Sequence, residues 1–206
     1  MSLPYQKQLD TLLTQLQTRP VLLLHSCCAP CSSYVLQYLI RYFRILLFYY
    51  NPNISPAEEY EKRVQEQKRL LAEMGLAEEI TWIEGSYEPQ RFFSAVKGLE
   101  QAPEGGARCA VCFRLRLEQA ARQAAQLGAD YFCTTLSISP HKNAALLNEI
   151  GESLARQYGV AWLPSDFKKK GGYQASIALS RQYCLYRQNY CGCIFSKQQA
   201  EEKASR

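Results

Sequence analysis

Seven of the nine cysteines in this chain lie in three short motifs, and their number suits metal binding. They occur in HSCCAPC, RCAVC and YCGC as Cys27, Cys28, Cys31, Cys109, Cys112, Cys191 and Cys193. A tetrahedral zinc ion and a [4Fe-4S] cluster each take four ligands. Seven thiols exceed one such site, so the pattern favours either two adjacent metal centres or one centre with redox-active thiols beside it.

The cellular setting expected from the sequence also favours metal over disulfides. The first residues, MSLPYQKQLD, contain no apolar stretch typical of a secretory signal, and the longest apolar run, 45–50, is too short to cross a bilayer. We therefore expect a cytoplasmic protein with no membrane segment, in which thiols stay reduced. Because only two histidines are present, a metal site would be rich in thiolates, which favours an iron-sulfur cluster over zinc.

Other interpretations of the cysteines remain open from the residues alone. Cys28-Ala-Pro-Cys31 follows an apolar run and precedes a predicted helix, as a thioredoxin-like redox pair does. A buried structural zinc site is a second alternative. Cys133 in an apolar strand and Cys184 in a helix are expected to be small core residues rather than ligands.

Strands and helices are predicted to alternate along the chain, which is typical of an α/β fold with a parallel sheet flanked by helices. Apolar runs predict five strands, at 21–25, 45–50, 79–83, 130–134 and 160–163. Helices are predicted at 4–18, 32–42, 56–74, 89–97, 109–127, 143–158 and 174–190. We expect a single domain, 1–206, comprising an N-terminal helix (1–19), an α/β core (20–165), a segment with a basic loop, a helix and the metal-binding CGC motif (166–195), and a flexible tail (196–206).

A polar segment follows each predicted strand, and in a parallel sheet these segments meet at one edge, where ligands bind. The cysteine loop HSCCAPC is the first of them, at the place where related folds carry a phosphate-binding loop. The loop contains no glycine, and the chain has neither G-x-x-x-x-G-K-[ST] nor G-x-G-x-x-G. ATP and dinucleotide chemistry are therefore not expected.

The last third of the chain combines basic and aromatic residues that suit RNA binding. Its basic residues include Lys142, Lys168, Lys169, Lys170, Arg181, Arg187 and Lys197, with Tyr173 and other tyrosines between them, and Arg108, Arg114 and Arg116 lie beside the second cysteine motif. Cations contact phosphates and aromatic rings stack on unpaired bases, although a solvated face over core tyrosines would have the same composition. The net charge of +5 is too small to decide between them.

Four polar residues near the expected sheet edge could serve either chemistry or structure. Asn51 and Asn53 lie in a turn with two prolines, where their carboxamides could contact a base edge or could form the turn itself. His25 ends a strand and could be a ligand, a base or a hydrogen-bonded core residue. Asp166 could be a helix cap, a metal ligand or a proton donor, and the sequence does not decide.

Six segments together resemble the epoxyqueuosine reductases of the QueH family. They are HSCCAPCSS, YNPNISPAEEYEKR, RCAVCFRLRL, TTLSISPHKN, SDFKKKGGYQAS and LYRQNYCGC, and the resemblance extends over residues 22–193. It implies an oxidoreductase that reduces the epoxide of epoxyqueuosine in tRNA to queuosine, the last step of that modification, without cobalamin. It also implies a Rossmann-like fold of the HUP (nucleotide-hydrolase-like) type with helices at both termini.

The same resemblance implies a [4Fe-4S] cluster beside a separate iron ion. The residues that match the metal-binding motifs of the family are Cys27, Cys28, Cys109, Cys112, Cys191 and Cys193. Cys31 matches a position where some members carry Asp, which could also bind iron. How these ligands divide between the two centres is not implied, but the adjacent side chains of Cys27 and Cys28 are expected to diverge and to serve different centres.

A mechanism follows as a hypothesis from the resemblance. The iron would act as a Lewis acid on the epoxide oxygen, and the cluster would supply two electrons in turn. Cys28, Cys31 and Asp166 are the expected catalytic residues, with His25 or a water as alternative proton donors. The expected substrate-binding residues are Asn51, Asn53, Lys168, Lys169, Lys170 and Tyr173, acting on a flipped base and the anticodon-loop phosphates.

We expect a monomer that takes electrons from an unidentified donor. Three rival functions stay open at this point. The first is a cluster-bearing tRNA thiolase of the ATP-pyrophosphatase type, and the second is a zinc module that binds RNA without catalysis. The third is a redox sensor, although the chain has more clustered thiols than a switch needs.

Overall fold

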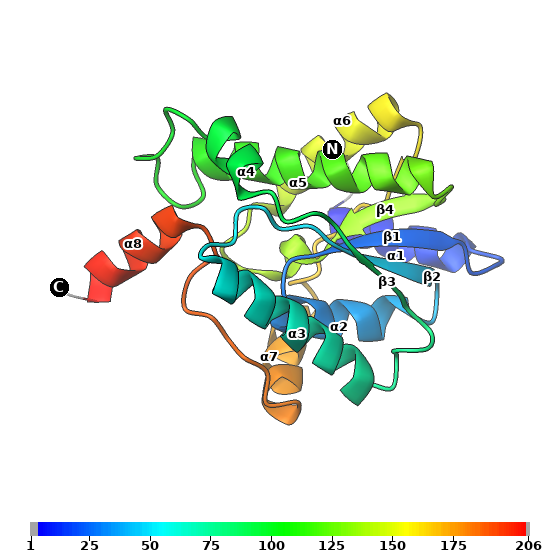
Figure 1. The fold of residues 1–206 in the computed structure, drawn as a ribbon. Coiled ribbons are helices and arrows are strands. Elements are labelled where there is room, and N and C mark those ends of the chain that lie inside the picture. Colours follow the sequence, from blue (N-terminus) through cyan, green and yellow to red (C-terminus); the bar gives the residue numbers. More distant parts are fainter. Residues whose placement is uncertain (1–3, 205–206) are drawn as a thin grey trace.

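The structure of the protein, a computed structural model, describes residues 4–204 and is built around a parallel five-stranded sheet (Figure 1). In chain order the strands are β1 (Val21–Ser26), β2 (Arg44–Tyr49), β3 (Thr81–Glu84), β4 (Tyr131–Thr134) and β5 (Ala161–Trp162). Their order across the sheet is β3-β2-β1-β4-β5. The predicted fold class and strand number are confirmed, and the strand boundaries differ only slightly from those expected.

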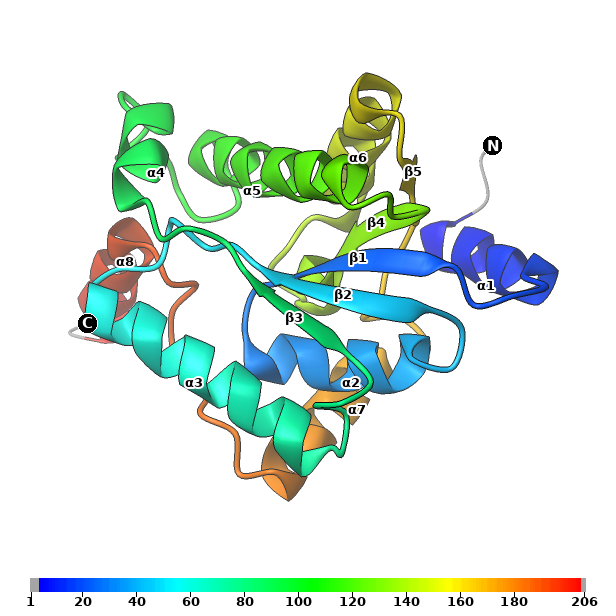
Figure 2. The same ribbon diagram turned by 45° about the vertical axis from the view of Figure 1, so that its right-hand side comes forward.

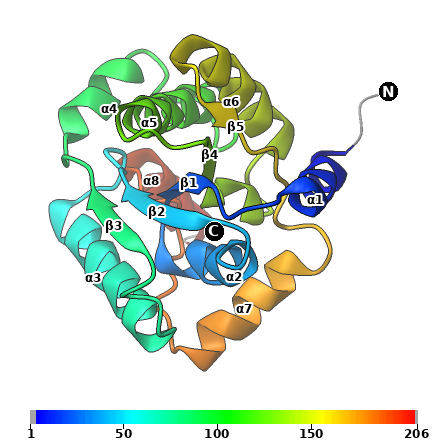
Figure 3. The same ribbon diagram turned by 90° about the vertical axis from the view of Figure 1, so that its right-hand side faces the viewer.

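Helices cover both faces of the sheet. They are α1 (Tyr5–Gln15), α2 (Ala29–Leu39), α3 (Ala57–Glu73), α4 (Pro89–Ala95), α5 (Ala107–Gln126), α6 (Ala144–Tyr158), α7 (Gly172–Gln182) and α8 (Ile194–Ala204), with a 3-10 turn η1 (Thr135–Ile138) after β4. Figures 2 and 3 show α4, α5 and α6 over one face and α2, α3 and α7 over the other. Within residues 4–204 no helix combines the length and the apolar character needed to cross a membrane.

The central strand β1 explains why the first apolar run of the sequence does not alternate. Leu22, Leu23 and Leu24 are all fully buried, because β1 pairs with β2 on one side and β4 on the other and is covered by helices on both faces. Phe132 of β4 and Leu117 of α5 belong to the same core. This rigid strand fixes the position of the cysteine loop that follows it.

The sheet order reverses between β1 and β4, so the loops that follow these two strands leave the sheet in opposite directions. Ligands of open α/β sheets bind in the crevice formed at such a point. The loop after β1 carries Cys27, and the loop after β4 is η1, which begins at Thr135. The hydroxyl oxygen of Thr135 accepts a hydrogen bond from the backbone amide of Cys27 at 3.2 Å. The cysteine loop therefore lies at the reversal point itself.

The predicted last helix, 174–190, ends early in the structure. Helix α7 stops at Gln182, and residues 183–193, which we call the C-terminal strap, run alongside α3 to the start of α8 (Figures 1 and 2). Cys184 has a positive φ of 46°, which a continuing helix would not allow. Glu66 of α3 accepts a hydrogen bond from the backbone amide of Tyr186 at 2.6 Å, and Arg69 donates one to the carbonyl of Tyr183 at 3.1 Å.

The segment predicted to be a flexible tail from residue 196 is largely helical, since α8 spans Ile194–Ala204. Two contacts hold the start of this helix. Phe195 packs against Phe92 of α4, and the hydroxyl of Ser196 donates a hydrogen bond to the carbonyl of Cys193 at 2.9 Å. The predicted tail residues 205–206 and the predicted helical residues 1–3 lie outside the described chain.

Candidate metal centre

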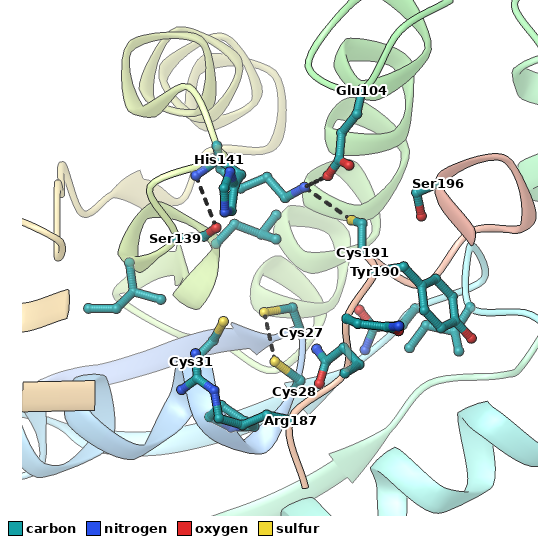
Figure 4. Close-up of a pocket in the computed structure, with 18 of the residues that line it drawn as sticks. Cys27, Cys28, Cys31, Glu104, Ser139, His141, Arg187, Tyr190, Cys191 and Ser196 are labelled. Carbon is teal, nitrogen blue, oxygen red and sulfur yellow. Dashed lines mark hydrogen bonds and ion pairs between the residues drawn. The ribbon is translucent and has the colours of Figure 1, made fainter. Parts of the chain in front are cut away.

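The three cysteines of the first motif lie at the junction of β1 and α2, and their sulfur atoms converge. The chain bends at Cys27, Cys28 is the N-cap residue of α2, and Cys31 lies in the first turn of that helix. The Sγ atoms of Cys27 and Cys28 are 3.8 Å apart, and all three Sγ atoms lie within 4.8 Å of one another (Figure 4). The expectation that Cys27 and Cys28 diverge is therefore wrong, because the bend turns both side chains into one cavity.

The same three thiols interact strongly in the absence of metal. The pKa of Cys28 is held well below its usual range because Cys27 and Cys31 donate hydrogen bonds to its thiolate and the Arg63 guanidinium lies nearby. The hydrogen bond to Cys28 raises the pKa of Cys27 to about 12, and the pKa of Cys31 is raised well above its usual range by its hydrogen bonds to Cys27 and Cys28. The loop therefore favours one thiolate and two thiols, and metal binding there would release protons.

The other four clustered cysteines come from two distant parts of the chain. Cys109 and Cys112, one turn apart in α5, and Cys191 and Cys193 of the strap line a second, smaller cavity. Within the described residues, Cys27, Cys28 and Cys31 are the one group of three or more potential ligands whose atoms converge so closely. The four cysteines around the smaller cavity are therefore spread more widely than the three of the loop.

Hydrogen-bond donors point at sulfur atoms of this four-cysteine group. The amide of Gly105 donates to Cys109 at 3.2 Å, and the amide of Ser196 donates to Cys193 at 3.4 Å. Burial still raises the pKa of the Cys109 thiol, and it raises that of Cys112 to about 12. The two amides lie where they would stabilise metal-bound thiolates of Cys109 and Cys193.

The glycine of the CGC motif is required by its surroundings. Gly192 has a φ of 130°, and a Cβ atom at this position would lie 3.0 Å from the Arg63 guanidinium and 3.1 Å from the Ile54 side chain. The carbonyl of Gly192 accepts a hydrogen bond from the amide of Ser55 at 2.9 Å, and Arg63 donates one to the carbonyl of Cys191 at 3.1 Å. The strap is thereby fixed on the loop between β2 and α3.

A buried arginine connects the two groups of cysteines. Arg116 lies four residues after Cys112 on the same face of α5, lines the larger cavity and is only 2% exposed. Its guanidinium donates a 2.5 Å hydrogen bond to Asn51 Oδ1, and Asn51 Nδ2 donates to the carbonyl of Ser26 at 3.0 Å. The sequence had indicated only general basic character near Cys109, although the spacing from Cys112 could have placed this arginine on the same helical face.

A lysine and a glutamate complete the wall between the cavities. Lys142 Nζ lies 3.1 Å from Cys191 Sγ and 3.1 Å from Glu104 Oε1 (Figure 4). Burial alone would lower the pKa of Lys142, but Cys191 and Glu104 raise it above its usual range, so the side chain stays an ammonium. No role for Glu104 follows from the sequence, because only the folded chain brings it beside Cys191.

The larger cavity has a volume of about 410 Å³ and is lined by half of the predicted site residues. Those that line it are Cys27, Cys28, Cys31, Asn51, Asn53, Tyr173 and Cys191. Asn51 has both ends of its carboxamide engaged by Arg116 and Ser26, whereas the buried Oδ1 of Asn53 has no hydrogen-bond partner. Of the two asparagines, Asn53 is therefore the one that has a polar atom left to offer a ligand.

Four predicted site residues lie outside the lining of both cavities among the described residues: Asp166, Lys168, Lys169 and Lys170. Asp166 pairs with Lys168, whose Nζ lies 2.7 Å from Asp166 Oδ1. Lys170 pairs with Asp10 of α1, and Lys169 is exposed. Asp166 and the three lysines of the basic loop therefore contribute no side chain to the walls of either cavity.

His25, considered above as a ligand or a base, is a core residue. It is fully buried, its Nδ1 lies 2.8 Å from Thr134 Oγ1, and its Nε2 lies 3.0 Å from the carbonyl of Tyr50. Burial holds its pKa well below the usual range, so the ring is neutral. Of the two cysteines predicted to be core residues, Cys133 is fully buried as expected, whereas Cys184 is exposed because α7 ends before it.

Comparisons with known proteins give a family match over most of the chain. The family described as "Epoxyqueuosine reductase QueH" matches residues 22–199 of the chain. Curated relatives of that name include a protein of Staphylococcus epidermidis, 43% identical over 93% of this chain and 84% of its own length, and one of Streptococcus pyogenes, 42% identical over 86% of this chain and 71% of its own.

A solved structure with the same fold is the U34-tRNA thiolase NcsA from Methanococcus maripaludis with its [4Fe-4S] cluster. The TM-score is 0.55, with 12% sequence identity over 98% of this chain and 71% of that one. At this identity the similarity supports the predicted HUP-like fold and carries no conclusion about the reaction.

Proposed function

This chain belongs to the epoxyqueuosine reductase QueH family, and we propose how its two groups of cysteines serve the reduction of an epoxide in tRNA. The protein is an epoxyqueuosine reductase, an oxidoreductase that acts on tRNA modified with epoxyqueuosine. The finer proposal concerns which residues hold metal and which hold the substrate.

The three cysteines of the loop would hold the separate iron ion. With metal–sulfur bonds of about 2.3 Å, tetrahedral geometry sets neighbouring sulfur atoms about 3.8 Å apart. The observed 3.8 Å between Cys27 and Cys28, with Cys31 inside the same 4.8 Å group, fits one ion. Three protein ligands also leave one position of a tetrahedral ion open for the substrate oxygen.

The four remaining cysteines would hold the [4Fe-4S] cluster. Each cysteine of such a cluster binds a different iron atom, so the sulfur atoms must lie further apart than around one ion. The wider spread of Cys109, Cys112, Cys191 and Cys193 supports this assignment. The solved structure of NcsA, which has a similar fold and contains a [4Fe-4S] cluster, supports the proposal that this type of cluster is bound.

Reduction of an epoxide to an alkene breaks two carbon–oxygen bonds and consumes two electrons and two protons, with the oxygen released as water. When bound, the cluster would supply the electrons singly and the iron would act as a Lewis acid on the epoxide oxygen. Cys28 and Cys31 would fix the position of that oxygen through the metal they bind. Asp166, paired with Lys168 outside the cavity lining, would have to move to deliver a proton.

The larger cavity would hold the modified base. Its volume of about 410 Å³ suits a flipped base, and Asn53 offers an unpartnered buried carboxamide oxygen to a donor on the base edge. Tyr173 is half-buried in the same wall and offers a ring for stacking. Lys169, exposed in the loop that leads to Tyr173, would contact an anticodon-loop phosphate.

The convergence of the three loop sulfur atoms beside four further cysteines is the observation that carries the proposal. Its test is to purify the protein without oxygen, count iron and sulfide, and record absorption and paramagnetic resonance spectra alongside conversion of epoxyqueuosine tRNA. We expect about five irons and four sulfides per chain. A colourless, iron-free protein that is fully active contradicts the proposal, and ATP-dependent sulfur transfer to tRNA would identify a thiolase instead.

A further inference from the structure

The contact between Lys142 and Cys191 is a charged hydrogen bond to a proposed cluster ligand. Lys142 lies just before α6, and its Nζ is 3.1 Å from Cys191 Sγ. The residue is only 8% exposed, although it lines the larger cavity. An ammonium buried to this degree needs acceptors around it, and here they are the Cys191 sulfur atom and the Glu104 carboxylate.

Glu104 holds the lysine in this position and opposes its charge. Its Oε1 lies 3.1 Å from Lys142 Nζ, and its side chain is 37% exposed. Glu104 and Cys191 each line both cavities, and Lys142 Nζ lies 3.1 Å from Glu104 Oε1 and 3.1 Å from Cys191 Sγ. The negative charge of Glu104 is therefore close to the proposed cluster but more screened by water than the charge of Lys142.

The other buried cations near the cysteines are positioned differently. Arg63 pairs with Glu59 at 2.7 Å and donates to the carbonyl of Cys191 rather than to its sulfur. Arg116 donates to Asn51 Oδ1 and also hydrogen-bonds the Cys112 side chain, with no carboxylate partner among the described residues. Arg108, which lines the smaller cavity, donates to the carbonyls of Glu100 and Ala102. Lys142 is thus placed to donate directly to the sulfur atom of Cys191, with an acidic partner that fixes its orientation.

Hydrogen bonds to cysteine sulfur atoms and the net charge around a cluster set its reduction potential. A reduced cluster carries one more negative charge than an oxidised one, so a nearby cation stabilises the reduced form and a nearby anion destabilises it. We propose that Lys142 is a positioning residue that raises the reduction potential of the cluster held in part by Cys191, and that Glu104 moderates this effect. The inference rests on the cluster assignment proposed above.

Redox titration of the reconstituted protein with dithionite tests the inference, using iron-replete Lys142→Met, Lys142→Arg and Glu104→Gln variants. In each titration the cluster gains one electron from dithionite and no bond is formed or broken. At the potential that half-reduces the wild-type cluster, Lys142→Met should lower the ratio of reduced to oxidised cluster about tenfold, which equals about 59 mV for a one-electron couple. Glu104→Gln should raise that ratio about threefold, and Lys142→Arg should return it close to wild type.

Lys68→Met is the matched control, because it also removes one lysine charge but from an exposed ion pair with Glu84 on α3 and β3. Its ratio should not change. The opposite signs expected for Lys142→Met and Glu104→Gln separate an electrostatic effect from loss of structure, which would move both variants in the same direction.

Two results overturn the inference. The first is an unchanged ratio of reduced to oxidised cluster in iron-replete Lys142→Met, whether or not this variant binds tRNA more weakly. The second is a shift of the same sign in Lys142→Met and Glu104→Gln. If Lys142→Met loses its iron, Glu104→Gln decides, and an unchanged ratio there overturns the inference. A wild-type protein that binds zinc and no iron refutes the proposed function first, so the two failures are distinguishable.

Discussion

The two groups of cysteines are constructed in contrasting ways. Cys27, Cys28 and Cys31 lie within five residues, and the end of β1 and the start of α2 alone bring their sulfur atoms within 4.8 Å of one another. The other group joins α5 to the C-terminal strap, and its two halves are separated by 78 residues of chain between Cys112 and Cys191. The first group is formed by local structure, whereas the second depends on tertiary contacts.

This contrast implies different sensitivities. The loop group is supported by the central strand, whose leucines are fully buried. The four-cysteine group needs the strap to stay on α3 and on the loop after β2, through the hydrogen bonds of Arg63 and Ser55. Substitutions far from the sulfur atoms should therefore disturb the second group more than the first.

The largest effects should come from removing one ligand of each group. Cys109→Ser should lose about four of the five irons and the visible absorbance of a cluster while keeping the separate iron. Cys31→Ser should lose the separate iron and keep the cluster. Iron and sulfide counts with paramagnetic resonance check both variants, and loss of all metal from both would show that the two centres are not independent.

Replacement of the adjacent cysteines tests whether they share a centre. Because the sulfur atoms of Cys27 and Cys28 are 3.8 Å apart, Cys27→Ser and Cys28→Ser should both lose the separate iron and keep the cluster. The same iron and sulfide counts measure this. Selective loss of the cluster from one of the two variants would refute the assignment of the loop to one ion.

Gly192→Ala should disturb the four-cysteine group alone. A Cβ atom would lie 3.0 Å from the Arg63 guanidinium at a φ of 130°, so we expect a destabilisation of about 1–3 kcal/mol and weaker cluster retention. Thermal unfolding and iron release to a chelator measure these effects. Gly159→Ala is a matched control, because Gly159 also has a positive φ but a Cβ atom there meets nothing within 4 Å, and it should lose some stability without losing iron.

Arg116→Met should weaken both groups to a smaller degree. The substitution leaves the buried Oδ1 of Asn51 without its donor, which costs about 1–3 kcal/mol. Since Asn51 also donates to the carbonyl of Ser26, just before the loop, iron occupancy should fall in both centres. Metal counts after dialysis against a chelator check this, and a loss confined to one centre would show that Arg116 does not connect them.

Cys184→Ser should change least. Cys184 is exposed and belongs to neither cavity lining among the described residues, so iron content should be unchanged and the free energy of unfolding should differ by less than about 0.5 kcal/mol. Chemical denaturation and an iron count measure both quantities. A loss of iron in this variant would mean that cysteine substitution alone, rather than ligand removal, explains the larger effects above.

The strands and most helices can be predicted from the sequence because apolar runs and amphipathic segments are local patterns that need no tertiary contact to be recognised. The candidate metal ligands are likewise visible in HSCCAPC, RCAVC and YCGC. Their division between two cavities is not, because it depends on the bend at Cys27, which places adjacent sulfur atoms 3.8 Å apart. The strap was also missed, since Tyr183 and Tyr186 have helical spacing and only their contacts with α3 end the helix.

Long-range contacts explain the remaining differences. The sequence suggests only RNA binding for Lys142 and no role for Glu104, because their contacts with Cys191 exist only after three separate segments come together. Asp166 and the lysines of the basic loop have the residue types expected at an RNA site, but the fold directs Asp166 to Lys168 and Lys170 to Asp10. The types of residue available for chemistry could be predicted from the sequence, whereas the pairs of side chains in contact could not.

The strap has a consequence for the fate of the protein under oxygen. A cluster held by Cys109, Cys112, Cys191 and Cys193 would cross-link the strap to α5, and such a link stabilises the native state by the free energy of metal binding. Oxidative loss of the cluster would remove that link and leave the strap attached only by hydrogen bonds and packing. The damaged enzyme would open first between α7 and α8, and a protease that cuts there would remove inactive molecules before they bind tRNA.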